Sequence, residues 1–228
     1  MILTDELVEA VFVKESKNRF LCEVLIDNAL EECYVSSSSR LQNYIKLKNK
    51  KVWLTRNRKK GRTKYALFAV QYYNKYILLN LNKVNDFLVE YLSLTNMQNN
   101  FELYKEKFID NYKADIILQD EKNSLRNIII EAKGIIGVNN EMLFPKVHSD
   151  RAIEQLKKIK NLLIEGKNVE YFFVSLSPIV KTVTLNKGHK QYSDLFLDCV
   201  GKGLIVRGIS VQLNESGKIF YNKIRVLL

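Results

Sequence analysis

Short apolar runs separated by charged and polar stretches fill the first third of the chain. They are rich in Val, Ile, Phe and Tyr, and several alternate apolar with polar residues, as half-buried strands do. This pattern predicts strands over residues 8–13, 19–26, 32–36, 51–55, 65–72 and 76–80. Five or six strands in so short a segment, with no helical period, favour a small all-β barrel of the OB-fold kind.

The period of the pattern changes after residue 82. Apolar residues then recur at helical spacing, with Asn82 as a suitable helix cap. The residues of this stripe are Val84, Phe87, Leu88, Tyr91 and Leu92. We therefore expect a barrel over residues 1–82 and a second domain over residues 83–228. Barrels of the OB-fold kind commonly bind nucleic acid, which we expect of residues 1–82. A short segment over residues 101–108 is expected to form another helix, which carries Glu106.

The second domain mixes strand and helix patterns. Ser149 is a good N-cap for a helix whose buried stripe includes Ile153 and Leu156, and Gly166 is placed to end that helix. A second helix is expected over residues 191–200. Strands are expected over residues 113–119, 126–132, 169–175, 204–211 and 218–226. This order implies a mixed α/β sheet covered by helices.

Two carboxylates and a lysine fall on the first two of these strands. Asp115 lies on the first strand, and Glu131 and Lys133 lie two residues apart on the second. Residues i and i+2 of a strand point to the same face, so Glu131 and Lys133 share one face while Ile130 and Ala132 point into a core. Charged groups gathered on one sheet face are costly to bury, which makes the trio a candidate site.

The trio has the chemistry that phosphodiester cleavage needs. A divalent cation such as Mg²⁺ (or Mn²⁺) takes one or two carboxylates, here Asp115 and Glu131, and activates water. Lys133 could orient that water or stabilise charge, and Glu106 could add a supporting contact. Arg151 could contact phosphate from the start of the following helix, or equally form an ion pair with a neighbouring acid. The alternative for the whole trio is a surface salt-bridge cluster at a strand end.

Basic residues exceed acidic ones by eleven, and they are concentrated in one stretch. Residues 46–64 contain ten Lys and Arg side chains and no acid. Such a polarised charge favours a polyanionic partner, although a generally basic surface would also give the overall excess. The candidate nucleic-acid contacts in this stretch are Arg56, Arg58, Lys59, Lys60, Arg62 and Lys64.

The three cysteines, Cys22, Cys33 and Cys199, are odd in number and have no zinc-site spacing. The first residues are acidic rather than a basic leader, and no apolar run approaches the ~20 residues of a membrane helix. We therefore expect a cytoplasmic protein with reduced thiols and no membrane partner.

The order strand, strand, helix around Asp115 and the Glu131-Ala132-Lys133 triplet resembles the PD-(D/E)XK nuclease core. The resemblance is closer still to the sugar fermentation stimulation protein A (SfsA) family. The E-V-K motif of that family looks like residues 131–133, and its F-P-D-A-V-T-E-R motif looks like residues 144–151, with Lys146 in place of the Asp. Its S-R-(F/I)-D motif is similar to residues 112–115, where only Asp115 is kept.

This resemblance implies an N-terminal OB-fold joined to a PD-(D/E)XK nuclease-like domain, with non-specific DNA binding. Its N-T-G-R segment looks like residues 37–40, which adds Arg40 to the expected nucleic-acid contacts. The leading hypothesis is a metal-dependent DNA endo- or exonuclease. The alternatives are a regulatory DNA-binding protein with a weak or inactive nuclease-like domain, and an RNA-binding or assembly factor. The oligomeric state is left open, a dimer included.

Overall fold

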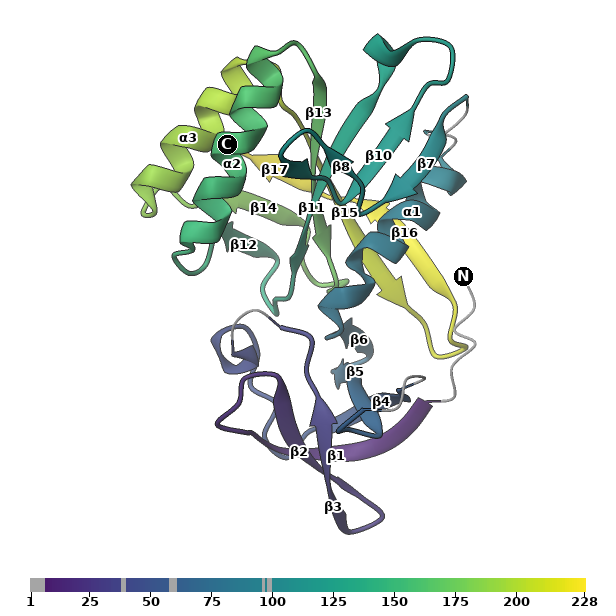
Figure 1. Ribbon diagram of the computed structural model, residues 1–228. Coiled ribbons are helices and arrows are strands. Elements are labelled where there is room, and N and C mark those ends of the chain that lie inside the picture. Colours follow the sequence, from purple (N-terminus) through teal and green to yellow (C-terminus); the bar gives the residue numbers. More distant parts are fainter. Residues whose placement is uncertain (1–6, 38–39, 58–60, 96, 98–99) are drawn as a thin grey trace.

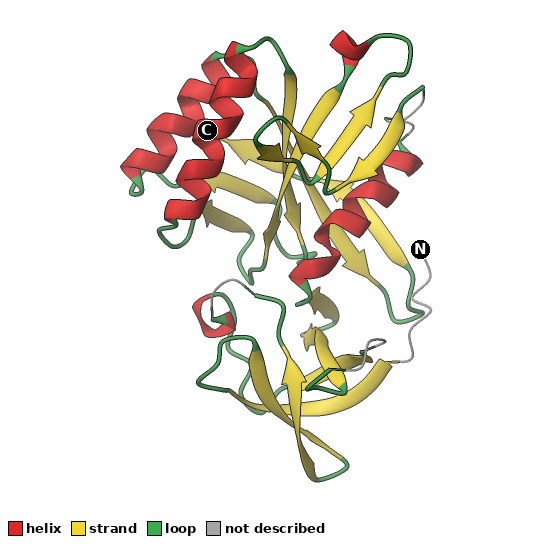
Figure 2. Cartoon of the chain, viewed as in Figure 1, coloured by secondary structure: helices red, strands yellow, loops and turns green. Residues whose placement is uncertain are grey.

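Five strands of the N-terminal part close into a barrel, the lower body in Figures 1 and 2. The computed structural model describes residues 7–37, 40–57, 61–95, 97 and 100–228. Neighbouring barrel strands pair antiparallel, and β3 closes the ring by pairing parallel with β5 through Cys33 and Tyr65. These strands are β1 (Leu7–Glu15), β2 (Leu21–Ile26), β3 (Ala29–Tyr34), β4 (Lys51–Arg56) and β5 (Tyr65–Tyr72). The predicted all-β barrel is confirmed.

The barrel continues into the second sheet without a break in packing. Strand β6 (Lys75–Leu78) pairs with β5 and meets β15 (Ile205–Leu213) at the Tyr76–Leu213 pair. The Leu78 N–H also donates to the Leu176 carbonyl at 2.8 Å. One hydrophobic cluster runs from barrel residues such as Val24 to sheet residues such as Val174. The two parts therefore share a core.

The second sheet is mixed, as predicted. Its strand order from the barrel outward is β6, β15, β13, β11, β10, β7, with β16 also paired to β15. The pairs β11–β13 and β13–β15 are parallel, and the other pairs are antiparallel. The remaining bounds are β7 (Glu102–Lys105), β10 (Ile116–Gln119), β11 (Ile128–Ile135), β13 (Asn168–Ser175) and β16 (Ile219–Lys223).

Helices cover both faces of this sheet (Figure 1). Helix α1 (Val84–Leu94) packs on the face that carries Ile130 and Ala132. Helices α2 (Asp150–Ile164) and α3 (Lys190–Gly201) pack on the face that carries Ile129 and Tyr171. The predicted cap of α2 is confirmed, because the Ser149 hydroxyl accepts from the Ala152 N–H at 3.2 Å.

Several short elements were not predicted. A small parallel sheet of β12 (Glu141–Phe144), β14 (Thr182–Leu185) and β17 (Arg225–Leu227) lies beside the main one. The hairpin β8 (Phe108–Ile109) and β9 (Tyr112–Lys113) precedes β10, and short 3₁₀ turns are η1 (Leu41–Asn43), η2 (Leu81–Lys83) and η3 (Ser124–Arg126). The single strand expected over residues 218–226 is wrong: it is split at Ile224 into β16 and β17, which belong to different sheets.

Two further expectations fail for local reasons. Asn82 does not cap α1; the Asn80 side chain accepts from the Asn82 N–H at 3.2 Å and starts the turn η2 that precedes the helix. Glu106 is not on a helix, because residues 102–105 pair with β10 as strand β7. Glu106 follows that strand in a turn with φ of 52°.

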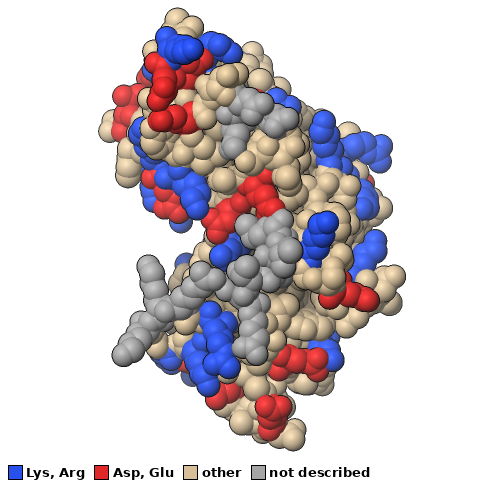
Figure 3. All heavy atoms as spheres, turned by 90° about the vertical axis from the view of Figure 1, so that its right-hand side faces the viewer, with Lys and Arg blue, Asp and Glu red and all other residues tan. Residues whose placement is uncertain are grey.

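The molecular surface mixes charges on the face drawn in Figure 3. Lys and Arg side chains lie over both parts of the molecule there, with Asp and Glu between them, so the visible part of that face has no continuous basic track. Among the described residues, no helix combines the length and apolar character that crossing a bilayer requires.

Candidate functional site

Glu131 lies at the centre of the candidate site, in β11 and beneath α2. Its side chain is fully buried and accepts hydrogen bonds from the Tyr112 hydroxyl and the Lys133 ammonium. The Gln155 amide of α2 donates to the same carboxylate at 2.7 Å. Burial raises the pKa of Glu131, the nearby Asp115 raises it further, and Lys133 opposes the shift.

Asp115 stands beside Glu131 but is held by different donors. The strand predicted over residues 113–119 is interrupted at Ala114 and Asp115. Before this break, Tyr112 and Lys113 pair with β8 in the β8–β9 hairpin, and only after it does the chain pair with β11. The Asp115 carboxylate fills the gap by accepting from the Ala132 backbone N–H at 2.8 Å. Its other oxygen accepts from the Asn85 amide of α1 at 3.2 Å. Asp115 is thus fixed between a strand edge and a helix.

Lys133 points to the same face as Glu131, as the strand period predicted. Its ammonium pairs with Glu131 and also donates to the Gln155 side-chain oxygen at 2.7 Å. The side chain keeps 23% of its surface exposed, whereas Glu131 keeps 1%. The ammonium therefore neutralises a buried carboxylate while it still reaches the pocket outside.

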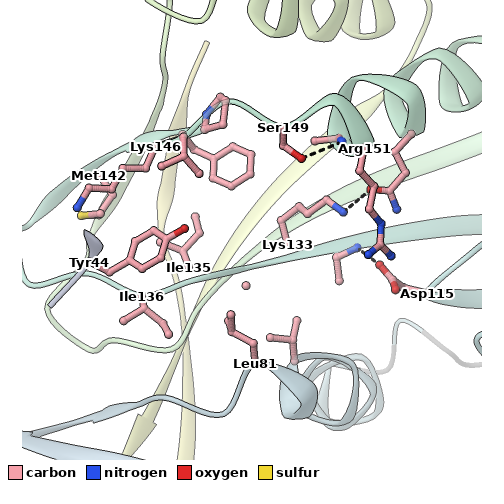
Figure 4. Close-up of a pocket in the computed structure, with 18 of the residues that line it drawn as sticks. Tyr44, Leu81, Asp115, Lys133, Ile135, Ile136, Met142, Lys146, Ser149 and Arg151 are labelled. Carbon is pink, nitrogen blue, oxygen red and sulfur yellow. Dashed lines mark hydrogen bonds between the residues drawn. The ribbon is translucent and has the colours of Figure 1, made fainter. Parts of the chain in front are cut away.

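A pocket of about 480 Å³ opens onto Asp115 and Lys133, whereas the buried Glu131 does not line it. Its charged end includes Asp115 and Lys133 on the sheet and Arg151 in the first turn of α2, all on the same side of the view in Figure 4. The guanidinium of Arg151 points toward Asp115 in that view, and no described carboxylate forms an ion pair with it. Glu106 lines the same pocket, but its carboxylate pairs with Lys113 at 2.6 Å.

The structure therefore brings together Asp115, Glu131, Lys133 and Arg151, with Glu106 at the margin. Sequence reasoning missed Tyr112 and Gln155 as partners of Glu131, and it did not assign Asn85 a contact with Asp115. Gln155 lies four residues after Arg151 on α2, so helical spacing on the face toward Glu131 was the available signal. Among the described residues, no third Asp, Glu, His or Cys joins the two carboxylates as a metal ligand.

The expected nucleic-acid contacts lie mainly on the barrel, away from this trio. Arg40 donates to the carbonyls of Ser16 and Lys17 at 3.0 Å and holds a barrel loop. Arg62 forms an ion pair with Glu32 at 2.9 Å, and Arg56 and Lys64 lie over the Tyr65 ring. The remaining expected contacts, Arg58, Lys59 and Lys60, lie outside the described residues.

Comparison with known proteins places both parts of the chain. Residues 15–79 match the family described as the SfsA N-terminal OB domain, and residues 81–217 match the sugar fermentation stimulation protein RE domain. A sugar fermentation stimulation protein homolog of Clostridium beijerinckii is 23% identical over 92% of this chain and 93% of its own length. The homolog of Pyrococcus furiosus is 21% identical, over 90% of this chain and 89% of its own.

A solved structure supports the same assignment. The structure of Pyrococcus furiosus SfsA in complex with Ca²⁺ superimposes with a TM-score of 0.85 at 19% identity and covers 100% of both chains. At that identity the likeness establishes the fold, namely the barrel joined to the helix-covered mixed sheet. With both family domains matched in order along the sequence, the chain belongs to the sugar fermentation stimulation protein (SfsA) family, as an N-terminal OB domain followed by the RE domain of that family.

Proposed function

We propose that the protein is a DNA-binding, divalent-cation-dependent nuclease whose catalytic residues are Asp115, Glu131 and Lys133. The observation that carries the proposal is that Asp115 and Lys133 line a pocket, and that Lys133 also pairs with the buried carboxylate of Glu131 behind that lining. A buried acid whose pKa is raised by burial, with a charge partner that reaches a pocket, is a candidate functional group.

The oxygen donors at this site suit a hard cation such as Mg²⁺ or Mn²⁺. Asp115 and Glu131 supply carboxylates. Ala132 adds a third oxygen, because the N–H and C=O of one strand residue point to the same edge and its N–H bonds Asp115. The Ca²⁺ bound by the Pyrococcus furiosus protein supports a cation site in this family. When bound, the cation would polarise the phosphate and lower the pKa of a water ligand.

The other side chains have roles set by position. Lys133 pairs with Glu131 and reaches the pocket, where its ammonium would orient water or stabilise charge on the phosphate. Gln155 contacts both Glu131 and Lys133 and keeps them in register. Arg151 presents a guanidinium to the phosphate backbone. Glu106 is a supporting residue at the pocket margin.

In this proposal the residues of the barrel bind the DNA backbone. Arg40, Arg56, Arg58, Lys59, Lys60, Arg62 and Lys64 give it ionic contacts that read no base sequence. The partner is therefore DNA without sequence specificity.

Cleavage of plasmid and of single-stranded DNA with Mg²⁺ or Mn²⁺ tests the proposal. Asp115→Asn, Glu131→Gln and Lys133→Met should each reduce cleavage by about 10²-fold or more while DNA binding is retained. Lys157→Met, an exposed lysine on the same helix as Gln155, is the matched control and should cut like the wild type. Absence of cutting by the wild type with either metal would sink the nuclease.

A second candidate is a DNA-binding protein without cleavage. It is favoured by one observation: in this structure the Glu131 carboxylate is already enclosed by three donors, Tyr112, Lys133 and Gln155. Calorimetric titration with Ca²⁺ separates the two functions. Binding that disappears in Asp115→Asn and Glu131→Gln supports the cation site, and no binding at all favours the second candidate.

A further inference from the structure

The pocket extends well beyond the residues that the proposed chemistry uses. Figure 4 shows Asp115, Lys133 and Arg151 at one end and Tyr44, Ile136 and Met142 at the other. Ile136 and Met142 are only 3% and 6% exposed, so packing holds them in place at this apolar end of the pocket, which we call the chamber. The side chains that form it are Tyr44, Leu81, Ile135, Ile136, Met142, Phe144 and Val147.

The chamber is built by both parts of the molecule. Leu81 comes from the turn between barrel and α1, Ile136 follows β11, and Met142 belongs to β12. Tyr44 reaches in from the barrel loop after η1, and the Lys146 ammonium lies over its ring at 5.3 Å from the centroid. Sites at such junctions between parts of a chain are common places for ligands.

We propose that this chamber receives one unpaired nucleobase of the nucleic-acid substrate, while the adjoining phosphodiester lies at Asp115 and Lys133. This rests on the proposed nuclease function. A nucleotide is an apolar plane joined to an anion, and the pocket passes from an aromatic and aliphatic end to an end with Lys133 and Arg151. Its volume of about 480 Å³ lies within the range of small-ligand sites.

The contacts at the chamber entrance fit the same occupant. Tyr44 provides an aromatic ring for the base, and Lys146, whose ammonium lies over one face of that ring, provides charge for the next phosphate along the strand. Aliphatic walls offer few hydrogen bonds to base edges, and the chamber should accept any base.

A base that is stacked and paired in a duplex cannot enter such a chamber without being extruded, which costs a few kcal/mol. The inferred substrates are therefore single strands and the unpaired nucleotides of ends, gaps or flaps. An intact duplex should bind the barrel through its backbone but should leave the chamber empty.

Fluorescence anisotropy with a labelled oligonucleotide, alone and annealed to its complement, tests this in EDTA so that no strand is cut. The wild type should bind the single strand at least ~10-fold more tightly than the duplex. Tyr44→Ala should weaken single-strand binding ~5- to 100-fold and leave duplex binding unchanged, whereas Tyr44→Phe should bind like the wild type. Tyr73→Ala, which alters an aromatic side chain that is 86% exposed and does not line the pocket, is the matched control.

A second variant guards against a local folding effect of Tyr44→Ala. Val147→Trp adds bulk at a partly exposed position of the lining and should block the base while the core packing stays intact, with the same selective weakening. An oligonucleotide made entirely of abasic nucleotides leaves no base for the chamber in any register, so Tyr44→Ala and the wild type should bind it equally. Equal weakening on duplex and single strand, or the same loss on the abasic oligonucleotide as on the normal one, would contradict the proposed chamber.

These outcomes separate the chamber from the nuclease. If the wild type cuts DNA but binds single strand and duplex equally, the nucleobase chamber is contradicted and the nuclease function is supported. A wild type that never cuts, yet whose single-strand binding is weakened by Tyr44→Ala and Val147→Trp, keeps the nucleobase chamber in a binding protein.

Discussion

The carboxylate of Glu131 is wholly removed from solvent, and burial raises its pKa despite the neighbouring Lys133. A raised pKa means that the folded state favours the protonated acid more than the unfolded state does. The contribution of Glu131 to the free energy of unfolding is fully present below the pKa of the unfolded state, near 4.3. It is lost as pH rises through the higher pKa of the folded state. At neutral pH the buried charge of Glu131 therefore lowers the free energy of unfolding, as strained groups at functional sites often do.

Glu131→Gln should raise the melting temperature at pH 7 in EDTA. The gain should shrink as pH falls toward 4, because the wild-type acid is then neutral as well. About 2–4 °C corresponds to each kcal/mol in a chain of this size. Calorimetric scans across that pH range provide the measurement, and Glu154→Gln, an exposed acid on α2, should change little. A lower melting temperature of Glu131→Gln at every pH would mean that the pair with Lys133 outweighs burial.

Tyr112 supplies the hydrogen bond that faces Glu131 from the β8–β9 hairpin. Burial and the adjacent carboxylate raise the pKa of the Tyr112 phenol, so it stays a donor. That hydrogen bond also lowers the pKa of Glu131 and partly offsets the effect of burial.

Tyr112→Phe should therefore raise the pKa of Glu131 further. We expect the acid limb of Ca²⁺ binding against pH to move to higher pH, with a decrease of about 1.5–3 kcal/mol in the free energy of unfolding. Titration calorimetry at several pH values and urea unfolding measure the two effects. Tyr104→Phe removes a similar hydroxyl from the exposed Glu102 and should leave both quantities unchanged. An unmoved acid limb in Tyr112→Phe would show that Glu131 does not control cation binding.

At the scale of elements, strand β11 packs closely against the start of α1 because Gly134 has no side chain. A Cβ on Gly134 would lie 2.5 Å from Leu81 Cδ2 and 2.7 Å from Val84 Cγ2, and Val84 is buried. Helix α1 also carries Asn85, which holds Asp115. Close packing at Gly134 thus positions part of the site.

Gly134→Ala should destabilise the fold by about 1–3 kcal/mol, since Val84 has little room to move. Gly201→Ala at the end of α3 is the control, because a Cβ there would meet nothing within 4 Å. Chemical denaturation of both variants measures the difference. If Gly134→Ala were as stable as Gly201→Ala, α1 would be more loosely seated than these contacts imply.

Elements with a long, clear period were predictable from sequence. The helix after Ser149 and the buried strand after Gly166 were placed within a residue or two, because each has its own cap and apolar stripe. The short strands β12, β14 and β17 were not predicted. Three or four residues are too few to show an alternating pattern, and these strands form hydrogen bonds only with segments far along the chain. The break at Asp115 was missed because there the Asp115 carboxylate, instead of a backbone carbonyl, accepts the hydrogen bond from the Ala132 N–H.

For the whole molecule, the shared core joins barrel and second domain into one packed body. Leu78 and Leu79 at the end of the barrel lie in the same cluster as Leu88 of α1 and Phe172 of β13. The shared face of Glu131 and Lys133 could be predicted because both lie on one strand, two residues apart. The pocket beside it could not, because Tyr44, Leu81 and Met142 meet only when this body is assembled.

Unfolding should therefore be a single cooperative transition. Calorimetric and van't Hoff enthalpies should agree, and the segment 1–82 expressed alone should lack a sharp transition. Two separated transitions in the full chain would show that the barrel is stable by itself.

The basic stretch of the barrel should dominate the salt dependence of DNA affinity. Neutralising Arg58, Lys59, Lys60 and Arg62 together should reduce the log–log slope by about 0.9 for each duplex phosphate that these side chains neutralise in the wild type. The control neutralises an equal number of lysines near α3, namely Lys181, Lys187, Lys190 and Lys202. An identical slope in both variants would exclude specific binding of phosphates by the stretch.

The hydrogen bond from the Ala132 N–H to Asp115 has one more consequence. That amide is the point where a sheet ladder ends on a carboxylate, so its exchange with deuterium reports the position of Asp115. A cation that draws the carboxylate away should speed exchange at Ala132 and shift its amide resonance. The peptide group at Ala132 is thus a spectroscopic reporter of cation binding that requires no label on the nucleic acid and no turnover.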